Sequence, residues 1–170
     1  MNFSTLFRLR ENLNLDRKTL VILRWIAIIG QFTAINLVYF YLNLKFPILI
    51  AHAILGIGFI TNLYLHFGIK SIILKDFNAS IFLIYDLIQL TALLYLTGGI
   101  SNPFSILMII PTIVSSTLLS VGTTIILGLL TIIFLFILTI FHYPLPGIHD
   151  HSVTFPKPYL IGYFLAIIVG

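Results

Sequence analysis

The sequence predicts an all-α integral membrane protein, a bundle of about six transmembrane helices of which the last is truncated. Hydrophobic residues make up 59% of the 170 residues, charged residues only 8%, and the mean hydropathy is +1.13. Apolar runs long enough to cross a bilayer core of about 30 Å recur along the chain. Backbone groups in lipid must pair within their own segment, so each run is expected to be a helix.

The apolar runs divide the chain into a short leading segment and one polytopic domain. Residues 1–21 form the leading segment and residues 22–170 the transmembrane domain. The last run is short and ends with the chain, and no soluble domain accompanies it, so we expect a piece of a longer protein. The spans are expected at residues 22–42, 47–67, 79–97, 104–120, 122–142 and 159–170.

The basic residues indicate the orientation in the membrane. Lys and Arg are enriched in cytoplasmic loops. Seven of the nine precede or open the first span or lie between the second and third, which predicts a cytoplasmic N-terminus. Their position at helix ends argues against a nucleic-acid-binding face. The seven are Arg8, Arg10, Arg17, Lys18, Arg24, Lys70 and Lys75, and we read Arg24 as an anchor at the membrane interface.

The chain contains no cysteine. Disulfides and thiolate-bound zinc or iron–sulfur clusters are therefore excluded within it. Any redox response here has to rely on another kind of group.

The turn between the third and fourth expected spans has strong helix punctuation. Gly98 and Gly99 are suited to the positive φ values that end a helix. Asn102 is a preferred N-cap, and Pro103 fits the first helical position, where no amide hydrogen is needed. The side-chain amide of Asn102 is also expected to remain free for a ligand carbonyl. This punctuation alone is equally typical of an ordinary helical hairpin.

A binding role for this turn is the alternative to a purely structural one. Tyr95 and Phe104 flank the turn, and the fourth helix begins there with free amide groups. A quinone head group requires hydrogen-bond donors for its carbonyl oxygens, a flat apolar surface and access from lipid. The turn offers all three.

The segment GGISNPF, residues 98–104, resembles the GGxxNPF heptapeptide of the RegB/PrrB family of redox-responsive sensor histidine kinases. In that family the heptapeptide is associated with ubiquinone binding. The resemblance implies quinone-binding roles for Tyr95, Gly98, Gly99, Asn102, Pro103 and Phe104. It extends to Thr19, Leu23, Arg24, Trp25, Gly30 and Gln31 in the first span, to Asp86, Leu87, Gln89, Leu90, Leu96 and Thr97, and to Pro111 and residues 112–119.

The resemblance implies a function for the longer protein. It would be a homodimeric, ATP-dependent histidine kinase whose response regulator controls redox-dependent gene expression. The present chain would be its membrane sensor domain, with ubiquinone as the sensed ligand and no direct contact with nucleic acid. The chain lacks the phosphoacceptor histidine, the redox-active cysteine and the ATP-binding domain of the family, so no catalytic residue is assigned.

Asp86 lies near the middle of the third expected span. An ionised carboxylate there costs about 2.5–3.5 kcal/mol even on the mildest scale, so it must be protonated, paired or hydrated. It either serves helix packing or relays the state of the ligand, with Gln89 on the same face. Pro111 in the fourth span would kink the helix, either as a movable joint or as a fixed bend.

Two other classes of protein remain as alternatives. One is a quinone- or haem-binding membrane anchor subunit of a respiratory complex. Haem would need axial histidines at matching depth on facing helices, and of His52, His66 and His142 only the first and last lie near the same end. We therefore expect neither haem nor another metal. The other alternative is a small transporter, for which Asp86 alone is thin support.

Overall fold

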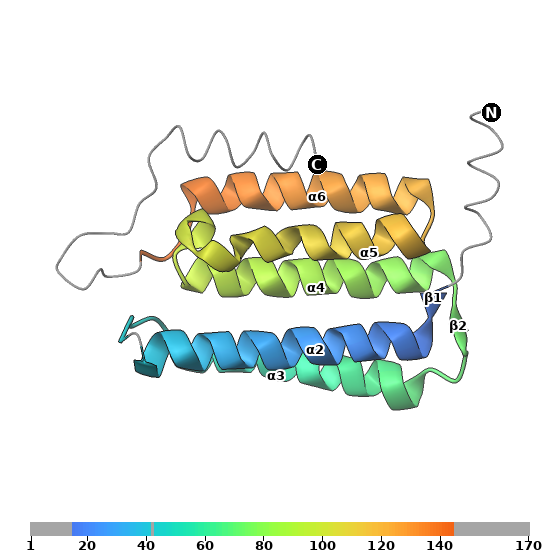
Figure 1. Ribbon diagram of the computed structural model, residues 1–170, viewed down its shortest axis with the longest axis horizontal. Coiled ribbons are helices and arrows are strands. Elements are labelled where there is room, and N and C mark those ends of the chain that lie inside the picture. Colours follow the sequence, from blue (N-terminus) through green and yellow to red (C-terminus); the bar gives the residue numbers. More distant parts are fainter. Residues whose placement is uncertain (1–14, 42, 145–170) are drawn as a thin grey trace.

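The computed structural model describes residues 15–41 and 43–144, which form a bundle of helices (Figure 1). Within them, four helical stretches are long and apolar enough to cross a membrane: Arg17–Tyr41, Ile48–Gly68, Asp76–Leu96 and Val121–Ile140. The first consists of α2 (Arg17–Asn36) with a π-helical last turn, Leu37–Tyr41, and the second of α3 (Ile48–Leu63) with a π-helical end, Tyr64–Gly68. The third is α4 (Asp76–Leu96) and the fourth is α6 (Val121–Ile140).

The fourth expected span, residues 104–120, differs from the prediction. It is a shorter composite of a 3₁₀ segment η4 (Pro103–Ile109) and the helix α5 (Ile110–Leu118). The 3₁₀ segment rises more per residue than an α-helix, so the composite extends over about 27 Å. The sixth expected span, residues 159–170, lies outside the described residues, and the prediction of about six spans is therefore confirmed for four.

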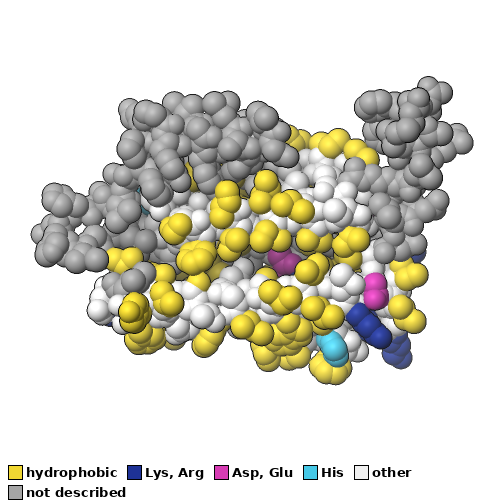
Figure 2. All heavy atoms as spheres, viewed as in Figure 1, with side chains coloured by type: hydrophobic (Ala, Val, Ile, Leu, Met, Phe, Trp, Pro, Cys, Tyr) yellow, Lys and Arg dark blue, Asp and Glu magenta, His cyan; other side chains and the backbone are white. Residues whose placement is uncertain are grey.

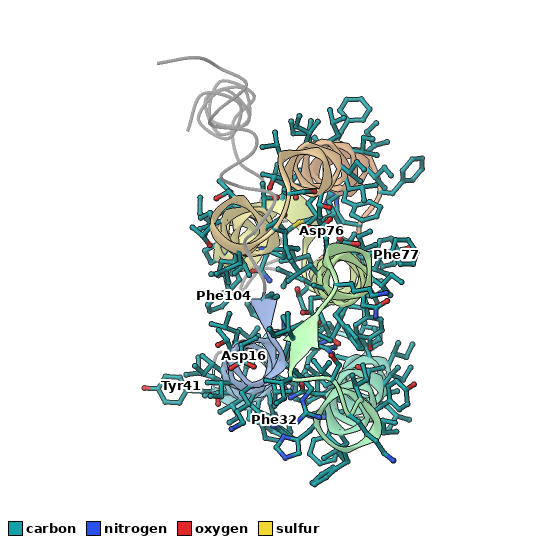
Figure 3. The ribbon with its side chains drawn as sticks, turned by 90° about the vertical axis from the view of Figure 1, so that its right-hand side faces the viewer. Asp16, Phe32, Tyr41, Asp76, Phe77 and Phe104 are labelled. Atoms are coloured by element: carbon teal, nitrogen blue, oxygen red, sulfur yellow. The ribbon has the colours of Figure 1, made fainter. Side chains whose placement is uncertain are left out.

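Helix α4 occupies the centre of the bundle. Helices α2 and α3 lie on one side of it, and α5 and α6 lie on the other (Figures 1 and 3). One apolar cluster joins α4 to α2 and α3 through Ile35, Leu55 and Leu93. Another joins it to η4 and α6 through Met108 and Leu135. The polypeptide therefore forms two helix groups that share α4.

The basic segments meet at one end of the bundle. Strand β1 (Leu15–Asp16) pairs antiparallel with β2 (Ile73–Leu74), which joins the chain before α2 to the loop before α4. The Arg17 side chain donates to the backbone carbonyls of His66 and Ile69. The two segments that were expected on the same side of the membrane thus lie together.

The outer surface of the described bundle is covered by large hydrophobic side chains (Figure 2). Tyr41 and Phe77 point away from the helices, as Figure 3 shows, and are 81% and 72% exposed. Such exposure is unfavourable in water and ordinary against lipid chains, which are as apolar as the side chains themselves. Length, composition and surface agree that this is a membrane protein.

Candidate ligand-binding site

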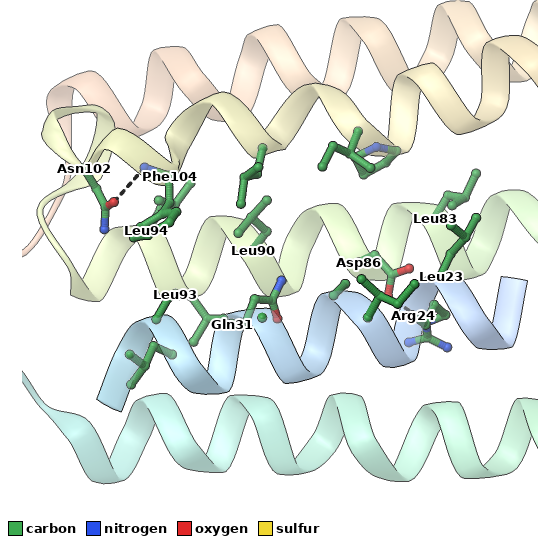
Figure 4. Close-up of a pocket in the computed structure, with 18 of the residues that line it drawn as sticks. Leu23, Arg24, Gln31, Leu83, Asp86, Leu90, Leu93, Leu94, Asn102 and Phe104 are labelled. Carbon is green, nitrogen blue, oxygen red and sulfur yellow. Dashed lines mark hydrogen bonds and ion pairs between the residues drawn. The ribbon is translucent and has the colours of Figure 1, made fainter. Parts of the chain in front are cut away.

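A cavity of about 340 Å³ lies between α2, α4 and the η4–α5 segment (Figure 4). Its walls are mainly aliphatic, and five polar side chains line it at intervals: Arg24, Gln31, Asp86, Thr97 and Asn102. Mostly apolar walls with a few placed polar groups are typical of small-molecule sites of this size. The cavity reaches from the turn after α4 past the middle of the bundle, as far as Leu20 near the start of α2.

The turn after α4 is built as predicted. Gly98 and Gly99 have φ values of 98° and 61°. Asn102 caps η4 by accepting a hydrogen bond from the Phe104 amide at 2.9 Å, and Pro103 holds the first helical position. A Cβ on Gly99 would lie 2.6 Å from the carbonyl oxygen of Leu138, so glycine also permits the turn to approach α6 closely.

One expectation about Asn102 is wrong. Its side-chain nitrogen donates to the Thr97 carbonyl at 3.1 Å and to the Thr97 hydroxyl at 2.8 Å. These bonds use the amide hydrogens that were expected to be free for a ligand. The short sequence separation between Asn102 and the end of α4 favours closing the turn on itself.

Of the other predicted quinone-binding residues, one lines the cavity and the rest do not. Phe104 lines the cavity and is 41% exposed, so it lies at an open rim. Gly98, Gly99 and Pro103 shape the turn and are not part of the cavity lining, and neither is the exposed Tyr95. The structure therefore brings Asn102 and Phe104 of this set to the cavity.

Asp86 is paired with Arg24, which corrects the reading of Arg24 as an interfacial anchor. The Arg24 side chain is 2% exposed, and its Nε lies 2.9 Å from Oδ1 of Asp86. Its Nη2 donates to the Thr61 hydroxyl at 3.0 Å, so the guanidinium joins α2, α3 and α4. The guanidinium also lies 5.2 Å from the ring centre of Phe82 and 5.4 Å from that of Tyr85. A carboxylate near the middle of a membrane span must be protonated, paired or hydrated, and the ion pair with Arg24 meets this requirement.

A second polar contact joins α4 to α2 and packs against α3. Gln89 of α4 donates to the side-chain oxygen of Gln31 at 2.8 Å and is itself buried. Gly58 of α3 leaves the space for it, because a Cβ there would lie 2.1 Å from Oε1 of Gln89. Gln89 is thus packed behind the cavity and reaches it only through Gln31, which lines the wall.

Pro111 lines the cavity as the second residue of α5. It was expected to interrupt a continuous helix, but it lies where 3₁₀ winding changes to α-helix. The amide of Ile110 still donates to the Leu107 carbonyl. A missing amide hydrogen is inexpensive in the first turn of a helix, so proline is tolerated there.

The candidate haem ligands near the same end of the bundle lie on separate elements. His52 is on α3, where its Nε2 lies 3.3 Å from the Asn36 amide nitrogen. His142 follows α6, with its Nδ1 3.0 Å from the Leu138 carbonyl oxygen. Helix α4 lies between α3 and α6 (Figure 3), so these two histidines are not on facing helices.

Two residues of the site were not assigned a place in it from the sequence. Gln31 entered the prediction only through the family resemblance, and Arg24 was otherwise read only as an interfacial anchor. The signal for Arg24 was present, because a carboxylate inside one span calls for a cation at similar depth in another. Helices α2 and α4 start at the same end of the bundle, and Arg24 and Asp86 lie 7 and 10 residues after these starts.

Comparison with known proteins relates the chain to a sensor kinase. It is 37% identical over 154 residues, 90% of its length, to the sensor histidine kinase RegB of Cereibacter sphaeroides. These residues span about a third of the length of that relative, 33%. No protein-family model and no solved structure matches the chain. The match does not favour the alternative of a respiratory anchor subunit. Over the aligned residues, the chain is similar to this sensor histidine kinase, which supports its identification as a membrane domain of the RegB/PrrB family.

Proposed function

We propose that this chain is the quinone-binding, redox-sensing membrane module of a two-component sensor histidine kinase. The observation that carries the proposal is the cavity between α2, α4 and the η4–α5 segment. The related protein is a sensor histidine kinase, and a sensor needs a site for its signal molecule. A membrane-embedded apolar cavity selects for a lipid-soluble ligand.

The shape and lining of the cavity suit a quinone with an apolar tail, such as ubiquinone. The long aliphatic walls accommodate a flat ring and the first part of a tail. Phe104 at the open rim offers an aromatic face, and exposed Ile106, Leu107 and Ile110 continue the apolar surface toward lipid. The polar side chains in the cavity provide hydrogen bonds for the ring oxygens.

The cavity also lies where a ligand can change the arrangement of the bundle. It separates α2 from α4 and α5, and the two sides are tied by the polar contacts of Arg24 and Gln31. A ligand shifts such an equilibrium when it binds two arrangements with different affinity. The shift would pass to a cytoplasmic kinase core through the basic end of the bundle, where β1 and β2 pair.

The remainder of the proposal concerns the complete protein. It would reside in a bacterial inner membrane with its N-terminus in the cytoplasm. It would act as a homodimer and phosphorylate a response regulator that controls redox-dependent gene expression.

The proposal can be tested by a substitution that fills the cavity with a larger side chain. Ala27 lines it on α2, one turn from Arg24, whereas Ala53 is exposed on α3 and outside the lining. Ala27→Phe should weaken binding of a short-tailed ubiquinone analogue to the purified protein at least tenfold, as measured by fluorescence quenching. Ala53→Phe makes the same change on the outer surface and should leave the affinity unchanged. Equal affinity of both variants and the wild type would contradict a quinone site in this cavity.

A further inference from the structure

The end of the bundle where β1 and β2 pair carries three exposed lysines without charge partners. Lys18 lies just after β1, Lys70 just before β2, and Lys75 directly after β2. In the described part of the chain the ion pair of Arg24 with Asp86 is the only one, so no carboxylate there neutralises these lysines. Figure 2 shows Lys and Arg side chains gathered at this end of the molecule.

The backbone holds the lysines of the two segments together. The Arg17 amide donates to the Ile72 carbonyl at 3.0 Å, and the Arg17 side chain donates to the Ile69 carbonyl. These bonds place Lys18 and Lys70, the residues that follow Arg17 and Ile69, at the same end of the short strand pair. The third lysine follows β2 directly, at the other end of that pair.

The two carboxylates at this end are engaged in starting helices. Asp16 caps α2 by accepting a hydrogen bond from the Lys18 amide at 3.3 Å. Asp76 accepts from the Ser120 amide at 2.7 Å and from the Thr123 hydroxyl, and so holds the start of α6. The charge of the lysine side chains is therefore left for a partner outside the described bundle.

Large apolar side chains are exposed beside the lysines. Phe67, Ile72 and Phe77 are 75%, 70% and 72% exposed, and they lie within a few residues of Lys70 and Lys75. A partner that fits this surface has negative charge and apolar groups next to each other. A phospholipid with an anionic head group has both, whereas a nucleic acid would leave the apolar side chains uncovered.

We infer that this end of the bundle is a binding surface for anionic phospholipid. The phosphate of the head group accepts hydrogen bonds from the ammonium groups of Lys18, Lys70 and Lys75, and the acyl chains lie along the neighbouring apolar side chains. Basic residues next to membrane helices attract anionic lipids in this way. The inference is independent of quinone binding, because none of the three lysines lines the cavity.

A bound lipid would also have a structural effect. Lys18 belongs to the start of α2, and the other two lysines belong to the loop between α3 and α4. A phosphate shared between them would tie together the same two segments that β1 and β2 join. It would also offset the repulsion among like charges that are brought close by the strand pair.

The test measures which lipid the intact chain retains. The protein is purified in detergent with equal amounts of phosphatidylglycerol and phosphatidylcholine, and the bound lipids are counted by native mass spectrometry. The wild type should retain phosphatidylglycerol preferentially. Replacing Lys18, Lys70 and Lys75 by Gln should reduce the preference by about fivefold for each lysine removed. Lys45→Gln is the matched control, because Lys45 is exposed at the opposite end of the bundle, and it should leave the preference unchanged.

Further variants separate charge from folding. Replacing the three lysines by Arg keeps the charge and should keep the preference, and the single Gln variants serve if the triple Gln variant is not recovered. Soluble glycerol phosphate, which has the charge without the tails, should not displace the lipid. A wild type without preference, a preference that survives in all the Gln variants, an equal loss in Lys45→Gln, or displacement by glycerol phosphate would overturn the inference. None of these outcomes would affect the proposed quinone site.

Discussion

Asn102 illustrates how one residue can be predicted correctly in one respect and wrongly in another. Its N-cap role follows from local sequence, because Asn followed by Pro is a frequent helix start, and the structure confirms it. Its expected free amide depended on where Thr97 would lie after the turn closed. That position is a result of the folded turn, so the residues alone did not reveal it.

The contacts of Asn102 predict a structural rather than a ligand-binding effect. Asn102→Ala removes the cap and both bonds to Thr97, which should destabilise the protein by about 2–3 kcal/mol. Asn102→Ser retains a capping oxygen and should lose less. Chemical unfolding in detergent, followed by circular dichroism, measures both.

A different result would assign Asn102 a direct role in ligand binding. If Asn102→Ala unfolds like the wild type but no longer binds quinone, its side chain contacts the ring directly. In that case the bonds to Thr97 would not contribute measurably to stability.

At the scale of elements, the sequence predicted the helices that have strong local signals and missed the winding of others. The turn of residues 98–102 and the start of η4 are specified by glycine, asparagine and proline, so they could be predicted. The 3₁₀ winding of η4 and the π-helical ends of the first two long helices have no such signal. They depend on packing against neighbours, which a single sequence does not display.

The contact between α3 and α4 predicts unequal effects of two glycine substitutions. Gly58→Ala would place a Cβ 2.1 Å from Oε1 of Gln89, so Gln89 must move and its bond to Gln31 is lost. Gly56→Ala, on the same helix, meets no atom within 4 Å and should be neutral or stabilising by up to about 1 kcal/mol. Thermal unfolding in nanodiscs should show a lower midpoint for Gly58→Ala only. Similar midpoints for both variants would mean that Gln89 is not confined by α3.

At the scale of the whole molecule, composition was sufficient to predict a helical membrane protein but not to predict where its ligand-binding cavity lies. Long apolar runs predicted helices that cross a membrane. The basic residues predicted that the chain before α2 and the loop before α4 lie on the same side of that membrane. The cavity arises where α2 faces α4 and α5, and the chain order of the helices does not reveal which of them are neighbours. Arg24 and Gln31 therefore acquired their place in the site only from the fold.

The orientation of the molecule gives a prediction that the absence of cysteine makes easy to test. Single cysteines are placed at Ser71 and at Pro103, which are exposed near opposite ends of the bundle. In intact bacterial cells a membrane-impermeant maleimide should label Pro103→Cys, whereas Ser71→Cys should react only after lysis. Labelling of Ser71→Cys in intact cells would reverse the proposed topology.

The most direct test of the account is to locate the bound quinone itself. A photoreactive quinone analogue is added to the protein in nanodiscs, illuminated, and its sites of attachment are mapped by mass spectrometry. The account predicts attachment within α2, α4 and the η4–α5 segment, at residues of the cavity wall, and its loss in Ala27→Phe but not in Ala53→Phe. Attachment on the outward faces of α3 and α6, or attachment that persists in Ala27→Phe, would contradict it.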